Sequence, residues 1–342
     1  MERTTQSNPM RKLTTALALV LAVLVIALVS GCSSADSSSD TSEEESGEVY
    51  NVAIVQLADN DAFTEMSTAF IDQMTELGYE EDVNIVYEME SAQGDSSNLQ
   101  TICSNLAADT ELDLIVSIVT PATQAAVNAE PDCPVVFISV TDPVGAGIMT
   151  SMDEPDKNAT GTSNVIPIDE IFELAAELTP DATNVGLLYC SGESNAVLTI
   201  EDAREYLDEN GYTYEEQSVA SSSEVQQAAE SLAATCDMIY VPVDSTVQSA
   251  MELVVEAATE AGIPVYGSDP VMVSSGALGS VSVSNTQLGQ RSAEMADMIL
   301  QGTDVSEIPA EALTEYQVVL NSTTAETLSI ELPDDDSYTI VE

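Results

Sequence analysis

The side chains in this sequence that could do chemistry are hydroxyls, amides and carboxylates that follow short apolar runs. Thr120–Gln124 comes after the run Leu114–Val119, and Thr141–Gly145 comes after the run Val135–Val140. Each run is rich in β-branched residues and too short for a helix, so each predicts a strand buried on both faces. Ligands of parallel sheets bind outside the carboxyl ends of the strands. These two polar loops are therefore the first candidates for a binding site.

Several kinds of catalysis are excluded because the chain has no histidine. Neither a Ser-His-Asp nor a Cys-His nucleophile can form, and a His-ligated metal site cannot form either. Gly145–Gly147 lacks the third glycine and the later acidic residue of a dinucleotide-binding turn, and Asp334–Asp336 is typical of a solvated acidic run. A site built of carboxylates alone could still form, but no motif indicates one. We therefore expect a binding protein with no catalytic residue, no metal and no cofactor.

The charge of the chain is extreme, with 60 acidic and 6 basic residues and a formal net charge of −54. Nucleic acid is not an expected partner, because phosphate binding requires clustered Lys and Arg. The excess of carboxylates predicts a solvated acidic surface. An anionic group of a ligand would then depend on helix N-termini and hydroxyls. A ligand ammonium would depend on a carboxylate such as Asp269, Asp244, Glu193 or Asp142.

Strands and helices alternate along the whole chain, which predicts parallel sheets with right-handed crossovers. In the first half the expected strands are Val49–Leu57, Asn84–Glu90, Leu114–Val119 and Val135–Val140, and the expected helices are Asp61–Leu77, Asn98–Ala108 and Ala122–Ala129. In the second half the expected strands are Asn184–Tyr189, Tyr212–Gln217, Met238–Val243, Pro264–Tyr266, Ala277–Ser282 and Tyr316–Leu320, the last before an acidic end. The expected helices there are Asp169–Leu178, Ala196–Asn210, Ser223–Ala233, Val247–Ala261 and Thr286–Gln301. Two α/β halves of similar size indicate two lobes that close by hinge motion on a ligand in the cleft between them.

The first 31 residues follow the plan of an export signal, with a basic start, the apolar run Leu13–Val29 and a stop of small residues. The run could also be a retained membrane anchor. Leu28–Cys32 favours cleavage, because it resembles the bacterial lipobox, in which the cysteine becomes the lipidated first residue. We therefore expect lipidation of Cys32 at the cell membrane. Residues 32–48 are rich in Ser and acid and predict a disordered tether.

Besides Cys32, which is the expected lipidated first residue, the chain has four cysteines, namely Cys103, Cys133, Cys190 and Cys236. An exported chain with an even number of cysteines permits two disulfides, and the three pairings cannot be separated from sequence. Free buried thiols are equally compatible with the sequence. The spacing is not that of a metal site.

The polar loops together resemble one known family, the ABC-transporter substrate-binding lipoproteins related to the tryptophan- and tyrosine-binding proteins of bacteria. The segments that carry the resemblance are Gln93–Leu99, Thr120–Ala122, Thr141–Gly147, Gly161–Ser163, Tyr240–Asp244 and Gly267–Asp269. The family's Tyr-Asn-Pro-Ser-Glu-x-Asn loop reads here as Tyr189–Asn195, which keeps Glu193 and Asn195 but lacks the first asparagine and the proline. The Asp-Asn-Thr of the family reads Asp244-Ser245-Thr246. The resemblance extends from about Val49 to Leu320.

This resemblance implies the type I periplasmic binding protein fold, with two doubly wound parallel-sheet lobes and three crossings between them. The first lobe would comprise residues 49–163 and about 284–311, and the second lobe residues 164–283 and about 312–342. The resemblance also implies delivery of a small solute, often an aromatic amino acid, to a membrane permease and its ATPase on the extracytoplasmic face. We expect a monomer. The expected ligand-binding residues are Thr120, Pro121, Thr123, Thr141, Asp142, Ser163, Ser191, Glu193, Ser194, Asn195, Asp244 and Asp269.

Two other functions remain open at this stage. The same fold could serve a sensory lipoprotein that feeds a receptor or kinase, or a binder of a sugar or nucleoside. An enzyme that acts on sugars or nucleotides is a weaker alternative, since the chain lacks histidine and any phosphate-binding loop.

Overall fold

The structure of this protein is a computed structural model, and it describes residues 49–334 and 336–342. The predicted signal segment, Cys32 and the predicted tether lie outside the described residues. The described residues form one compact unit. Within the part of the chain that the structure describes, no helix is both long and apolar enough to cross a membrane.

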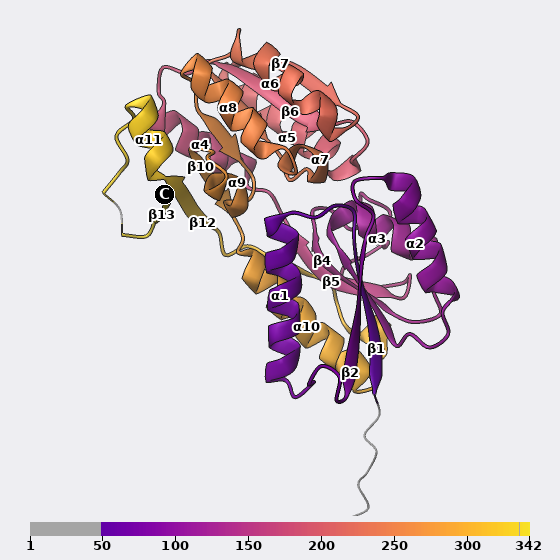
Figure 1. The fold of residues 1–342 in the computed structure, drawn as a ribbon. Coiled ribbons are helices and arrows are strands. Elements are labelled where there is room, and N and C mark those ends of the chain that lie inside the picture. The colour runs from indigo at the N-terminus through magenta and orange to yellow at the C-terminus, as the bar shows by residue number, and fades with distance from the viewer. Residues whose placement is uncertain (1–48, 335) are drawn as a thin grey trace, which may run out of the picture. The chain divides into compact units, whose positions relative to one another are not determined.

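The first sheet has six strands in the order β11-β5-β4-β3-β1-β2 (Figure 1). All of its pairs are parallel. Its strands are β1 (Tyr50–Gln56), β2 (Ile85–Ser91), β3 (Leu114–Ile118), β4 (Val135–Val140), β5 (Ala159–Asn164) and β11 (Glu311–Leu313). The helices α1 (Asp61–Glu76) and α10 (Asn285–Leu300) cover one face, and α2 (Ser96–Ala108) and α3 (Val119–Asn128) cover the other. We call this sheet with its four helices the first lobe.

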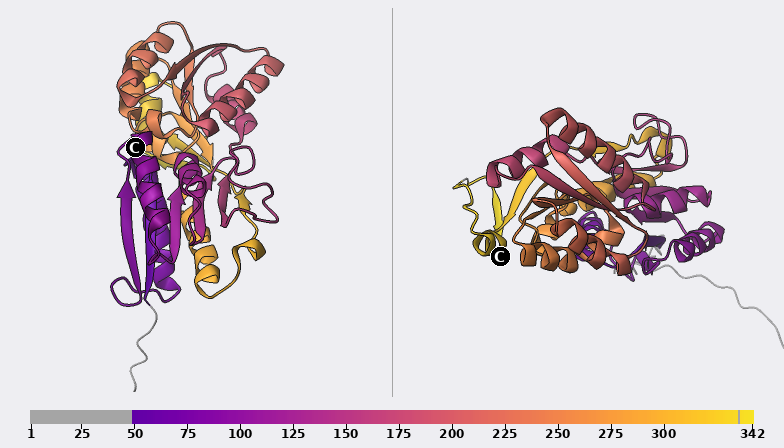
Figure 2. Two further views of the ribbon diagram at one scale, coloured as in Figure 1. Left: turned by 90° about the vertical axis from the view of Figure 1, so that its right-hand side faces the viewer. Right: turned by 90° about the horizontal axis from the view of Figure 1, so that it is seen from above.

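The second sheet has seven strands in the order β13-β12-β10-β9-β8-β6-β7. Its strands are β6 (Asn184–Cys190), β7 (Thr213–Val219), β8 (Met238–Val241), β9 (Val265–Gly267), β10 (Gly279–Ser282), β12 (Gln317–Asn321) and β13 (Thr339–Val341). The helices α4 (Ile168–Leu178) and α5 (Ser194–Asn210) pack on one face, and α6 (Val225–Ala233) and α8 (Met251–Ala261) on the other. The short helices are α7 (Ser245–Gln248), α9 (Pro270–Ser274) and α11 (Ser322–Leu328), and 3₁₀ turns lie at Ser222–Glu224 and Val305–Glu307. We call the second sheet with α4–α9 and α11 the second lobe (Figure 2).

The structure confirms the two predicted α/β sheets with helices on both faces. The prediction that the sheets are parallel is wrong at one pair, because β10 and β12 are antiparallel. The path of the chain explains this exception. Among the described residues the chain passes between the lobes three times, after β5, after β10 and after β11. Strand β10 runs toward the first lobe and leaves the second sheet there, whereas β12 arrives from the first lobe. The two neighbouring strands must therefore run in opposite directions.

The polar segment after β3 is a helix and not the expected loop. The strand ends at Ile118, and α3 begins directly at Val119, whose φ of 61° turns the chain from one element into the next. Thr120, Pro121 and Thr123 therefore lie in the first turns of α3. Proline is tolerated there because the first N–H groups of a helix have no intrahelical partner.

Three other predicted elements also differ from the structure. The helix expected at Val247–Ala261 is the separate pair α7 and α8, because the backbone leaves the helical conformation at Ala250, which has φ −122° and ψ 22°. The segment Gly161–Ser163, grouped with the polar loops in the sequence analysis, belongs to the buried strand β5. Gly161 has φ 151°, and a Cβ there would lie 2.0 Å from the carbonyl oxygen of Phe137 on β4. The strand expected to end the fold is followed by α11 and β13.

The four cysteines of the described chain are all free thiols, of which Cys103, Cys190 and Cys236 are buried. Cys103 and Cys133 belong to one core of the first lobe, and Cys190 and Cys236 to one core of the second. The sequence left disulfides and free thiols equally open, and the structure has the free form.

Candidate functional site

The polar ends of the two sheets meet in a cleft between the lobes. A hollow of about 240 Å³ is lined by Asp59 and Gln93 of the first lobe and by Ser221 and Thr246 of the second. These residues follow β1, β2, β7 and β8, so they lie at the carboxyl ends of parallel strands in both sheets. Parallel sheets bind their ligands at this edge.

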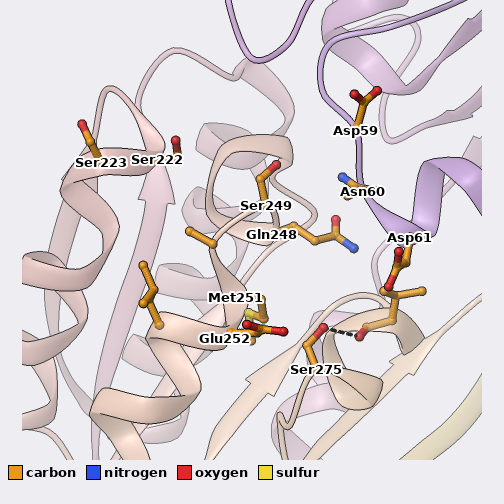
Figure 3. A pocket seen from close by; sticks show the side chains of 13 residues that line it. Asp59, Asn60, Asp61, Ser222, Ser223, Gln248, Ser249, Met251, Glu252 and Ser275 are labelled. Carbon is orange, nitrogen blue, oxygen red and sulfur yellow. Dashed lines mark hydrogen bonds between the residues drawn. The ribbon is translucent and has the colours of Figure 1, made fainter.

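A larger pocket of about 470 Å³ opens beside this hollow, and Figure 3 shows it from close by. We call it the mouth pocket. Its first-lobe wall is the segment Asp59–Asp61 at the start of α1. Its second-lobe wall comprises Ser222, Ser223, Gln248–Leu253, Val271 and Ser275. In Figure 3 the amide of Gln248 extends from α7 toward Asn60 and Asp61.

Glu193 and Asp244 are held inside the second lobe by the start of α7. The Glu193 carboxylate accepts hydrogen bonds from the backbone N–H groups of Ser245 and Thr246, both at 2.9 Å, and from the Thr246 hydroxyl at 2.8 Å. Asp244 accepts from the N–H of Val247 at 2.8 Å and from the N–H of Cys190. Both side chains are buried, so their oxygens serve mainly to fix α7.

These two carboxyls also interact with each other. Burial raises the pKa of Asp244 well above its usual range, and the neighbouring Glu193 raises it further. A pair of buried carboxyls without a cation keeps a proton more firmly than an exposed acid does. This arrangement leaves little acceptor capacity for a ligand.

Asp269 is different, because one of its two oxygens is free. The carboxylate is 2% exposed and caps α9 by accepting from the N–H of Val271 at 2.8 Å. The same oxygen, Oδ1, accepts from the Gln248 amide at 3.3 Å and from the Asn285 amide at 3.5 Å. Among the described residues, Oδ2 of Asp269 has no hydrogen-bond partner. Burial raises the pKa of the Asp269 carboxyl to about 6.

Polar groups also gather where the first sheet meets the cleft. The N–H of Thr141 donates to the Thr120 hydroxyl at 3.4 Å, and Ser163 donates to the carbonyl of Thr141 at 3.2 Å. The hydroxyl of Thr141 and the amide oxygen of Asn164 are buried without a partner among the described residues. Unpaired buried polar atoms are rare in native proteins, so they point to a missing ligand or water.

The backbone is strained at the same edge. Val119, directly after β3, has φ 61°, and Ser139 near the end of β4 has φ 65°. A positive φ is unfavourable for a β-branched residue. The pairing of β4 with β5 also shifts register between Phe137 and Val140, which indicates a bulge. Strain of this kind clusters at binding sites, where the surrounding fold enforces it.

The remaining predicted residues occupy different environments. Asp142 is exposed and accepts from the N–H of Gly145 at 2.8 Å within its own turn, and exposed Ser191 donates to the carbonyl of Val219 at 3.4 Å. Thr123 is buried inside the first lobe, where it bonds Ser117. None of these three residues lines the two pockets of the cleft.

Ser194 and Asn195 lie closer to the cleft. The Ser194 hydroxyl donates to the amide oxygen of Gln124 at 3.4 Å and so links the start of α5 in the second lobe to α3 in the first. Asn195 donates to the carbonyl of Val243 at 2.8 Å, while its own amide oxygen is buried without a partner among the described residues. Pro121 lines a groove of about 500 Å³ between α2 and α3 that also reaches Gly192.

Sequence reasoning missed Gln248 and Asn285, and Asn60 is not among the expected ligand-binding residues. Asn60 does cap α1, by accepting from the N–H of Phe63 at 2.9 Å, but its amide nitrogen is buried without a partner among the described residues. Gln248 was hidden because α7 and α8 were predicted as one helix. Asn285 begins the helix that follows a crossing between the lobes, which is the signal that could have found it.

No cationic side chain lines either pocket of this cleft in the described chain. Lys157 donates to the carbonyl of Gly147. Arg204 pairs with Glu216 at 2.9 Å, and Arg291 pairs with Glu311 at 2.7 Å. These are the cations of residues 49–342, so a ligand anion would have to be held by neutral donors.

The sequence matches the ABC transporter substrate binding protein family over residues 51–338. The chain belongs to this family. The tyrosine-binding protein of Clostridioides difficile is 35% identical over 287 residues, which cover 84% of this chain and 83% of that protein. Members of the ABC transporter substrate binding protein family bind the substrate of a transporter. This chain is therefore a substrate-binding protein and not an enzyme.

Two solved structures are informative about the arrangement of the lobes. The ABC domain in complex with L-Trp from Streptococcus pneumoniae is 28% identical, covers 86% of this chain and 100% of that one, and superposes with a TM-score of 0.82. The ligand-free, open structure of a substrate-binding protein with adhesive properties from Clostridium difficile is 33% identical, with coverage of 86% and 99%, yet its TM-score is 0.66. This chain therefore superposes better on the ligand-bound protein than on the ligand-free, open one, although the open one is more identical in sequence.

The fold is that of the type I periplasmic binding proteins, as more distant solute-binding proteins with the same architecture also show. Proteins of this family bind small solutes outside the cytoplasm and work with an ABC permease and its ATPase. The chain is therefore a solute-binding component of an ABC transporter.

Proposed function

We propose that this protein is the lipid-anchored, monomeric solute-binding component of an ABC importer, and that its lobes close over an amino acid. The observation that carries the choice of ligand is the free Oδ2 of Asp269, a buried carboxylate that contacts no cation among the described residues. A ligand ammonium would supply the missing positive charge. Cys32 would provide the anchor, on the strength of the lipobox-like sequence before it.

An ammonium bound to Asp269 cannot account for the whole affinity. A charge-assisted hydrogen bond contributes roughly 1.5–3 kcal/mol net, whereas micromolar binding requires about 8 kcal/mol. The first lobe must therefore contribute. Helix α3 begins without a side-chain cap, and the unpartnered hydroxyl of Thr141 lies on the neighbouring strand end. Together they offer neutral donors for the carboxylate of an amino acid.

A zwitterion bound in this way would bridge the two lobes, with its carboxylate on the first and its ammonium on the second. Bridging of this kind explains why binding favours closure, because the ligand has its full set of contacts only in the closed form. The link between Ser194 and Gln124 adds a direct contact between the lobes. Tyrosine and tryptophan are the first ligands to test, because one relative is named a tyrosine-binding protein and one similar structure contains L-Trp.

A thermal-shift titration with a panel of amino acids and nucleosides tests the proposal. A ligand that binds only the native state raises the melting temperature by mass action. We expect at least one amino acid to do so, and we expect Asp269→Asn to weaken that shift strongly. Asp208→Asn, an exposed change on α5, is the control. A response to nucleosides alone, or a ligand response that is the same in Asp269→Asn, would reject the amino-acid assignment.

A further inference from the structure

Asn285 carries a buried amide oxygen that no group of the described chain satisfies. The side chain is fully buried, and its Oδ1 has no hydrogen-bond partner in residues 49–334 or 336–342. Asn285 is the first residue of α10, directly after the chain passes from the second lobe to the first. A buried acceptor without a donor loses its hydration and gains nothing in return, so such atoms are rare. The oxygen of Asn285 therefore indicates a donor that comes from outside the chain.

The neighbours of Asn285 determine which way its amide points. Its Nδ2 donates to Oδ1 of Asp269 and to Oε2 of Glu65, both at 3.5 Å. In the reverse orientation the amide oxygen would lie against two carboxylates, and neither of them can donate a hydrogen bond when ionised. The two carboxylates thus hold the nitrogen, and Oδ1 is left as the free end of the amide.

The contact between Asn285 and Asp269 joins the two lobes and leaves one free oxygen on each side chain. Asp269 caps α9 in the second lobe, whereas Asn285 begins α10 in the first. All donors to Asp269 use its Oδ1. Oδ2 of Asp269 and Oδ1 of Asn285 are therefore two unused acceptors on a pair of hydrogen-bonded side chains.

A primary ammonium fits this pair of acceptors best. It has three donors and no acceptor, so it can bind both oxygens at once. Water could also donate to both, but it would leave the charge of Asp269 uncompensated. Burial raises the pKa of the Asp269 carboxyl and the charge of Glu65 raises it further, whereas the hydrogen bond from Asn285 opposes this rise. A bound cation would relieve both unfavourable effects, and hydrogen bonds to a charged donor are about twice as strong as neutral ones.

The start of α10 also lies at the edge of the first sheet where ligands are expected. The hydroxyl of Thr162 on β5 donates to the carbonyl of Leu288 on α10 at 3.4 Å. Leu288 is about one turn after Asn285, and Thr162 is two residues before Asn164, the last residue of β5. Asn285 is thus placed near the carboxyl end of β5, where the amide oxygen of Asn164 is also unpartnered within the described chain. Parallel sheets bind their ligands at this edge.

We propose that Asn285 is a ligand-binding residue, whose amide oxygen accepts a hydrogen bond from the ammonium of an amino acid while Asp269 accepts another. The proposal rests on the proposed function, in that the ligand is an amino acid held between the lobes. The ammonium would then contact the first lobe as well as the second, which adds to the number of contacts that bridge them.

Calorimetric titration at about pH 8, where Asp269 is ionised, compares two substitutions that treat the amide oxygen differently. Asn285→Leu has the same branching but no acceptor, whereas Asn285→Asp keeps an acceptor oxygen and loses the donor. The probes are L-tyrosine, L-tryptophan and the other standard amino acids, and those that bind the wild type are titrated into the variants. We expect the affinity to be weaker by about tenfold or more in Asn285→Leu and within about threefold of the wild type in Asn285→Asp. Thr286→Val is the control, because it removes a 2.8 Å hydrogen bond to the same Glu65 from the next residue and should leave the affinity unchanged.

A purely structural role of Asn285 predicts the opposite order of the two variants. If the amide served only as a donor, Asn285→Asp would place a third carboxylate against Asp269 and Glu65 and would bind at least as weakly as Asn285→Leu, which would overturn the proposal. Equal affinity in Asn285→Leu and the wild type would also overturn it, because water would then satisfy the amide oxygen, while amino-acid capture would stand. Should Asn285→Leu fail to fold in urea-unfolding measurements, Asn285→Ala takes its place with the same expected loss. If no amino acid binds the wild type, the proposed function itself fails, and the role of Asn285 fails with it.

Discussion

Asp269→Asn should change how the stability of the ligand-free protein depends on pH. The Asp269 carboxyl is buried and has no cationic neighbour in residues 49–334 or 336–342, and burial raises its pKa from 3.8 to about 6. Between these two values the native state retains a proton that the unfolded chain has lost. The free energy of unfolding therefore falls as the pH rises through this window and is constant above it. At 1.36 kcal/mol for each pKa unit, the loss from Asp269 is about 3 kcal/mol.

The rest of the chain also titrates, so the measurement must be a difference. Urea unfolding of the wild type and of Asp269→Asn is followed at intervals from pH 4 to pH 7.5, without ligand. The wild type should lose about 3 kcal/mol relative to the variant over this range. Asp95→Asn is the matched control, because Asp95 caps α2 in the same way but is exposed.

A wild-type curve that stays parallel to that of Asp269→Asn would refute the reasoning, because it would mean that Asp269 titrates like an exposed acid. The same ionisation governs the ligand, since an ammonium binds the charged carboxylate. Affinity for an amino acid should therefore fall as the pH drops below about 6 in the wild type, and this fall should be absent from the residual binding of the variant.

Three further substitutions test the fold and the closed form. Glu193→Ala removes the acceptor of three hydrogen bonds at the start of α7, so we expect a loss of about 2–4 kcal/mol in urea unfolding, and a loss below 1 kcal/mol would contradict the assigned cap. Gly161→Ala should lose about 2–5 kcal/mol, because a Cβ would overlap the carbonyl of Phe137 at a positive φ; an unchanged unfolding midpoint would mean that β5 shifts freely. Ser194→Ala removes the link to Gln124, so calorimetry should show a ligand affinity weaker by about two- to fivefold with an unchanged unfolding midpoint, whereas equal affinity would show that the link does not stabilise closure.

The order of strands and helices could be predicted because hydrophobic periodicity is a local signal. Val135–Val140 is apolar at every position but Ser139 and matches β4 residue for residue. Helix α1 was placed within one residue of its end, since Asn60 before it and Gly78 after it are strong boundary signals. Such elements carry their information in neighbouring residues.

The errors occur where tertiary contacts outweigh local preference. Ala159–Asn164 is too polar and too rich in Gly and Thr to read as a core strand, yet every residue is buried between β4 and β11. The break between α7 and α8 has no proline or glycine to mark it. The carboxylates of Glu193 and Asp244 fix the start of α7 by hydrogen bonds to its backbone. Glu193 lies 52 residues before Ser245, which donates one of these bonds. Contacts of that range leave no trace in the local sequence.

The candidate site shows the same limit in its chemistry. Asp142, Glu193, Asp244 and Asp269 each follow a predicted strand, and the sequence offers no reason to prefer one of them as an ammonium acceptor. The structure separates them by the donors that each already binds. Asp142 caps its own exposed turn, and Glu193 and Asp244 bind the backbone of α7. Asp269 differs from Glu193 and Asp244 because only one of its two carboxylate oxygens accepts hydrogen bonds from the described chain.

Helix capping and ligand binding compete for the same oxygens in this fold. Strand-end carboxylates cap the helices that follow, as Asp244 does for α7 and Asp269 for α9. A cap needs one oxygen, so a carboxylate that caps with Oδ1 alone keeps Oδ2 for a ligand. All donors to Asp269 use Oδ1, whereas both oxygens of Asp244 and both of Glu193 are occupied. Replacing Asp269 by Asn should therefore preserve the cap on α9 and remove the charge that the ligand needs, which makes it the substitution that separates binding from folding.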